Sequence, residues 1–90
     1  MEYHYHDNVR QELLSKGIKI TKGTPPELAK LQLNDLYRFE IRQLRQRFRH
    51  GEIARSEYAH HVISLRRRYP LLSLPTSLWT QPHRVNRKES

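Results

Sequence analysis

Arginines form the densest chemically active pattern in this sequence. Between residues 38 and 69 there are nine arginines, no lysine and three acidic residues, so this stretch carries a formal charge of +6. Steps of four, three and four residues place four of them in one line along an α-helix, and a further group follows near residue 67. Because a planar guanidinium binds phosphate in a bidentate manner, we predict a nucleic-acid contact at Arg38, Arg42, Arg45, Arg49, Arg66, Arg67 and Arg68.

The charge of the whole chain favours an acidic partner. Its 17 lysines and arginines against 9 acidic residues give a net charge of +8 and a pI near 10.3. Such a balance is typical of proteins that bind nucleic acid, an anionic membrane surface or an acidic protein surface. Nothing in the sequence marks a base-reading residue, so DNA or RNA would be bound with low sequence specificity. The alternative is a solvated face with a few intrahelical ion pairs, but three acids cannot neutralise nine arginines.

The sequence contains none of the usual catalytic or metal-binding motifs. It has no glycine-rich phosphate loop and no nucleophile elbow, and the absence of cysteine removes thiol chemistry and disulfides. The six histidines lack the spacing of a zinc finger or a metalloprotease helix. A metal site would require His4 and His6 to meet His60 or His61 across the chain. We therefore expect a non-enzymatic protein with no catalytic residue, metal or cofactor.

The arginine line requires a helix, and the apolar pattern predicts a pair of helices. Apolar residues step by four, three and four on both sides of Gly51, at Tyr37, Ile41, Leu44 and Phe48 and at Tyr58, Val62, Leu65 and Tyr69. When the second set is read backwards, the residue numbers of facing pairs always add to 106, as in an antiparallel coiled-coil seam. The pattern predicts an all-α fold with an antiparallel helical hairpin. Its long central helix spans about 25–50 and its return helix about 55–69, separated by Gly51 and ended by Pro70.

Shorter signals complete the predicted domain. Asp7 is expected to cap a short N-terminal helix over about 8–16, which Gly17 closes. Thr24 and Glu27 have the spacing of a capping box, with a proline at the first helical position. The prolines from Pro70 onward exclude another long helix and predict an irregular C-terminal strap. We expect one domain, 1–79, with its hairpin core at 25–69, and a disordered basic tail at 80–90.

The long helix also carries a second apolar face. This face lies opposite the hairpin seam on a helical wheel, which implies another neighbour besides the return helix. The neighbour could be the N-terminal helix, the C-terminal leucines or a second copy in a homodimer. Candidate protein-interaction residues are Leu28, Leu31, Leu36, Phe39, Leu74, Leu78 and Trp79. They support the alternative function, a protein–protein adaptor or a small subunit or assembly factor of a larger complex.

The turn between the two helices resembles a known helical hairpin. Gly51, Ile53, Glu57 and Tyr58 match the turn of the SHOCT (short C-terminal) type, whereas Ala54 stands where that type has a capping serine or threonine. The resemblance covers about a third of the chain. It implies oligomerisation or adaptor work rather than catalysis.

The sequence also indicates where the protein works. The lack of cysteine suits a reducing compartment, the start of the chain does not read as a secretory signal, and no segment has the ~20 apolar residues of a membrane span. We expect a cytoplasmic protein without integral membrane association. Peripheral binding to an anionic membrane remains a third possibility.

Overall fold

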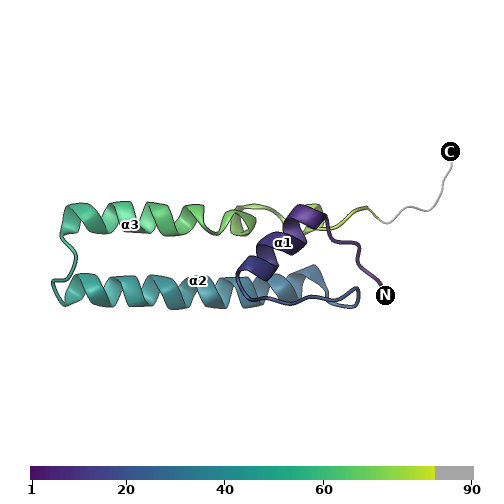
Figure 1. Cartoon of the computed structure of the whole chain (residues 1–90), viewed down its shortest axis with the longest axis horizontal. Coiled ribbons are helices and arrows are strands. Elements are labelled where there is room, and N and C mark those ends of the chain that lie inside the picture. The colour runs from purple at the N-terminus through teal and green to yellow at the C-terminus, as the bar shows by residue number, and fades with distance from the viewer. Residues whose placement is uncertain (83–90) are drawn as a thin grey trace.

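The computed structural model describes residues 1–82, and within them the chain is helical (Figure 1). Helix α1 spans Asp7–Ser15, α2 spans Pro26–Arg49 and α3 spans Arg55–Arg67, followed by two short 3-10 turns at Pro70–Ser73 and Thr76–Leu78. The predicted all-α class is confirmed over these residues. The long helix is a single unbroken element of 24 residues.

Helix α3 lies beside the C-terminal half of α2 (Figure 1). Near the turn, Phe48 stacks on Tyr58 with ring centroids 4.6 Å apart. At the other end of α3, Tyr37 meets the edge of Tyr69 with centroids 5.2 Å apart. Both are pairs whose residue numbers add to 106. Between them, Leu44 and Leu65 are buried, and Ile41 and Val62 are partly buried against the same core.

The α2–α3 turn is built by Gly51. Its backbone φ of 76° lies in the left-handed region, which glycine adopts without a steric penalty. The Gly51 N–H donates to the carbonyl of Phe48 at 3.1 Å, and the Glu52 N–H donates to that of Arg47 at 2.9 Å. This pair of bonds is a Schellman motif, which satisfies the last carbonyls of α2 and reverses the chain.

Substituting Gly51 is expected to destabilise the protein modestly. In Gly51→Ala the added Cβ would meet no atom within 4 Å, so no steric clash contributes. The loss of stability, about 1–2 kcal/mol, would come from placing alanine in the left-handed conformation. Urea unfolding followed by circular dichroism measures it. Gly23→Ala is the matched control because Gly23 does not have a left-handed φ. Equal stability of both variants would contradict the role given to Gly51.

The predicted side-chain caps are wrong. Helix α1 begins at Asp7 itself, and α2 begins at Pro26, so Pro25 occupies the N-cap without a side-chain bond. A residue before a proline is biased to extended backbone, and Pro25 accordingly has a φ of −64° and a ψ of 140°. The helix therefore starts one residue later than predicted. The Thr24 hydroxyl instead accepts a bond from the Thr21 N–H at 3.0 Å.

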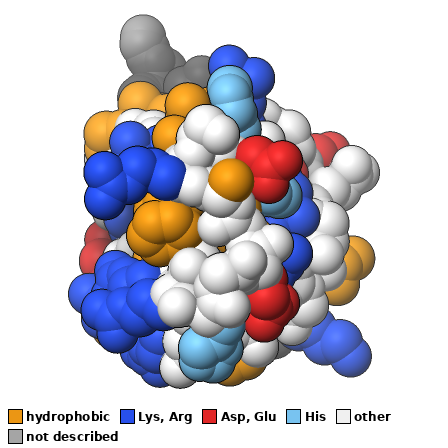
Figure 2. Space-filling model, turned by 90° about the vertical axis from the view of Figure 1, so that its left-hand side faces the viewer, with side chains coloured by type: hydrophobic (Ala, Val, Ile, Leu, Met, Phe, Trp, Pro, Cys, Tyr) orange, Lys and Arg blue, Asp and Glu red, His pale blue; other side chains and the backbone are white. Residues whose placement is uncertain are grey.

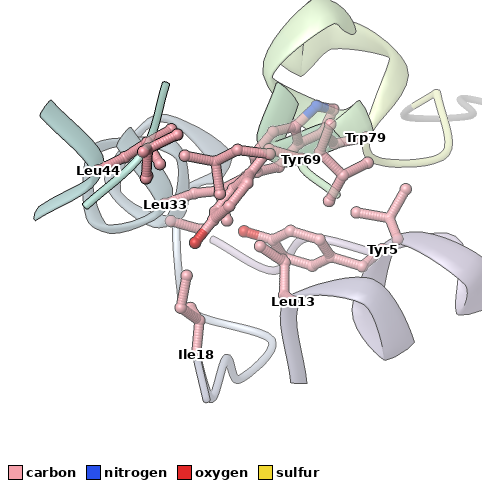
Figure 3. Packing of buried hydrophobic residues seen from close by; sticks show 12 residues of the cluster. Tyr5, Leu13, Ile18, Leu33, Leu44, Tyr69 and Trp79 are labelled. Atoms are coloured by element: carbon pink, nitrogen blue, oxygen red, sulfur yellow. The ribbon is translucent and has the colours of Figure 1, made fainter. Parts of the chain in front are cut away.

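A core forms where α1, α2 and the segment after α3 meet. Figure 3 shows Tyr5, Leu13, Tyr69 and Trp79 gathered there, and the last three are at most 2% exposed. The indole N–H of Trp79 donates to the carbonyl of Leu74 at 3.0 Å. The segment after α3, predicted as an irregular strap, contains two 3-10 turns and supplies the largest fully buried side chain, Trp79.

The two ends of the described chain pair with each other. Tyr5 and Thr80 form an isolated antiparallel bridge, and the Gln81 N–H donates to the carbonyl of His4 at 2.8 Å. Ordered backbone pairing therefore continues past residue 79, where the tail was expected to begin. The rest of that predicted tail, 83–90, lies outside the described residues. Among the helices of residues 1–82, none has the length and hydrophobicity of a transmembrane span.

Candidate nucleic-acid interface

The arginine line of α2 lies along one flank of the α2–α3 pair. Its residues are displaced to one side of the seam, and an open groove there is lined by Tyr37, Arg38, Ile41, Arg42 and Arg45. A second groove shares Tyr37 and adds Arg66 of α3. Helical spacing places Arg49 and Arg55 on the same side. We call this set the basic flank: Arg38, Arg42, Arg45, Arg49, Arg55 and Arg66.

The three acidic side chains between Arg38 and Tyr69 lie on the opposite flank. Arg68 contacts Glu40 at 3.1 Å and Arg47 contacts Glu52 at 3.6 Å. Glu57 lies on the same side of α3 as Arg68, three helical turns away. We call this set the paired flank: Glu40, Arg47, Glu52, Glu57 and Arg68. Figure 2, viewed from the α2–α3 turn, shows blue side chains around an apolar patch on one side and most of the red ones on the other.

The basic flank is exposed and uncompensated. All six of its arginines are exposed, and none forms a salt bridge with any residue from 1 to 82. On this face of α2 the nearest acid is Asp35, one turn before Arg38. From Arg38 to Arg49 the line is about 16 Å long at 1.5 Å per residue, which equals about five phosphates of one duplex strand. The flank can therefore contact several consecutive phosphates at once.

The structure separates the three arginines that end α3. Consecutive helical residues point about 100° apart, so Arg66 joins the basic flank, Arg67 points away from α2, and Arg68 pairs with Glu40. Arg55 is absent from the set predicted from the sequence. The sequence could have indicated it, because Arg55 precedes Arg66 by eleven residues. Eleven residues make about three turns of an α-helix, so the two side chains lie on the same side.

The predicted protein-interaction residues fall into an exposed group and a buried group. Leu28, Leu31 and Phe39 are 47%, 60% and 51% exposed. Leu36 and Leu74 are partly buried against the core, while Leu78 is exposed. Trp79 is fully buried, so in this structure it is a core residue and no surface anchor.

A partly buried hydrogen bond holds Glu40 on the paired flank. The Tyr69 hydroxyl donates to the Glu40 carboxylate while Arg68 contacts its other oxygen. Burial raises the pKa of Tyr69 well above its ordinary value, and the bond to Glu40 raises this pKa further. The carboxylate is thereby directed away from the arginine line, which keeps the two flanks electrostatically distinct.

Tyrosine ionisation is expected to destabilise the protein at high pH. Burial, assisted by the charge of Glu27, raises the pKa of Tyr5 from 10.0 to about 12, and Tyr69 shifts the same way. The unfolded chain then loses these protons at a lower pH than the folded one, so stability falls as pH rises above about 10 and is unaffected below it. Urea unfolding at pH 8 and 11 measures the decline. It should be shallower for Tyr5→Phe and Tyr69→Phe, and a decline equal to the parent's would contradict the account.

The described residues offer no metal centre. From residue 1 to residue 82, no group of three histidine or acidic side chains is placed to hold a metal ion. His83 lies outside this range. The long-range meeting of histidines that a metal site would need does not occur within it.

Comparisons of this chain with protein-family models, curated proteins and solved structures found no match. The resemblance to SHOCT-type hairpins is therefore limited to the turn between the two helices. Any function has to be argued from the two flanks and from the exposed apolar side chains.

Proposed function

We propose that this protein is a small non-enzymatic nucleic-acid-binding or nucleoprotein accessory factor that contacts phosphates through the basic flank. One observation carries the proposal: six exposed arginines from two helices share a flank on which none of them forms a salt bridge with a described residue, while Glu40 and Glu52 pair with arginines of the other flank. We further propose that the antiparallel hairpin, braced by the C-terminal strap, is the scaffold that keeps these flanks apart in a cytoplasmic protein.

The proposed binding mode is contact with the backbone of DNA or RNA. Guanidinium groups along a 16 Å line would follow successive phosphates, and the two arginines of α3 would widen the contact. Because phosphate contacts position a protein without reading bases, we expect affinities that differ little between sequences of equal length.

Titration of a labelled duplex at several salt concentrations tests the proposal. Each neutralised phosphate releases counterions, so four arginine contacts predict a log–log slope of about −3 to −4 for the affinity against salt. An unrelated duplex sequence should give nearly the same slope. A slope near zero, or no binding at low salt, would contradict phosphate contact.

The second candidate is a protein–protein adaptor. Leu28, Leu31 and Phe39 expose about half of their surface on α2, which phosphate binding does not explain. If the basic flank binds an acidic protein surface instead, replacing its arginines would abolish a protein complex and leave the binding of DNA and RNA unchanged.

A further inference from the structure

The solvent-facing side of α2 exposes large apolar side chains. Leu28, Leu31 and Phe39 lie on it at helical spacing, and no described element covers them. Leu28 and Leu31 are neighbours three residues apart, while Phe39 lies about 12 Å farther along the helix than Leu31. Exposed apolar side chains that gather on one surface, in contrast to single scattered ones, are typical of contact sites. This surface therefore requires an explanation that the basic flank alone does not give.

The same side of α2 continues into the arginine line. Arg42 follows Phe39 by three residues, and Arg38 follows Leu31 by seven, both of which are same-face steps. The outer face of α2 is thus apolar between residues 28 and 39 and cationic between 38 and 49. Asp35 is the one acid within it, and it forms no salt bridge with the described residues.

An anionic lipid surface matches both halves of this face. A helix lying in a membrane interface buries leucine and phenylalanine at the acyl boundary and holds arginines at the headgroup phosphates. A nucleic-acid backbone would contact only the arginines and leave the apolar side chains exposed. A second copy of the chain would be repelled, because each copy carries a charge of +8. We propose that the outer face of α2 adsorbs in the plane of an anionic membrane, with Leu28, Leu31 and Phe39 inserted and the arginines on lipid phosphates.

Co-sedimentation with vesicles tests this proposal on the full chain. The parent should bind vesicles of phosphatidylcholine containing about a third phosphatidylserine, and should not bind phosphatidylcholine alone. Arg42→Gln with Arg45→Gln should weaken binding about 30-fold, since each cation near such a surface contributes a factor of about five. Replacing Leu28, Leu31 and Phe39 by serine should weaken it at least tenfold.

The apolar variant separates this proposal from the proposed function. All three side chains are exposed, so circular dichroism should show an unchanged fold, and the variant should bind duplex DNA as the parent does. Asp35→Asn, which does not touch the core, should bind the anionic vesicles about fivefold more tightly.

Three results would overturn the membrane proposal. The first is no binding of the parent to the anionic vesicles. The second is equal binding by the parent and the serine variant, which would mean electrostatic attraction alone. The third is self-association of the parent in sedimentation that the serine variant loses, which would assign the apolar half to a second copy. Each leaves the test of duplex binding intact.

Discussion

Replacing Trp79 by alanine is expected to lower the free energy of unfolding by about 3–5 kcal/mol. The indole is fully buried and is the largest side chain of the core. Its removal also leaves the Leu74 carbonyl without the indole N–H. A loss of this size is a large share of the stability of a 90-residue domain. The effect should be visible as a lower urea midpoint.

Leu78→Ala is the matched control for this change. Leu78 is the last residue of the 3-10 turn that directly precedes Trp79, but it is 55% exposed. Its truncation should therefore cost about 0.5 kcal/mol or less. Far-UV circular dichroism is the suitable probe because Trp79 is the chain's single tryptophan and its fluorescence is lost with it. If the two variants were equally stable, the segment after Pro70 would not belong to the core.

The double substitution Arg42→Gln and Arg45→Gln is expected to weaken duplex binding about 30-fold at 0.15 M salt. The estimate assumes that two phosphate contacts are lost. Each contact contributes ~0.9 to the slope of log affinity against log salt concentration. Both side chains are exposed and form no salt bridge with a described residue, so stability should change little. The loss should be similar on duplexes of different sequence, because backbone contacts carry no base information. Equilibrium titration of parent and variant under the same buffer measures it.

The main helices could be predicted because their signals are local and repeated. The 4-3-4 steps around Gly51 specify both helix period and facing partners, and the stacking of Phe48 on Tyr58 follows that register. The capping-box spacing at Thr24 led to a wrong prediction, because the helix does not begin there. Two adjacent prolines hold Pro25 extended and move the helix start, a backbone effect that outweighs the side-chain spacing.

The candidate site was only partly predictable. The line from Arg38 to Arg49 follows from helical spacing. Its distinction from the arginines of the paired flank depends on ion pairs, and the pair of Glu40 with Arg68 joins residues 28 positions apart in the sequence. Adjacency in the sequence also suggested that Arg66 and Arg68 act together, whereas a helix directs them to opposite sides. From the sequence, Trp79 could either dock on a partner or fold back onto the helices. Only the tertiary packing distinguishes these two possibilities.

The most direct test of the central claim compares two variants of equal charge. Arg42→Gln with Arg45→Gln removes two arginines from the basic flank, and Arg47→Gln with Arg68→Gln removes two from the paired flank. Duplex affinity is measured for each against salt. We predict that the first variant flattens the log–log slope by about two units and the second leaves it close to the parent's. Equal flattening by both variants would mean that net charge alone drives binding and would contradict the assignment of the site to the basic flank.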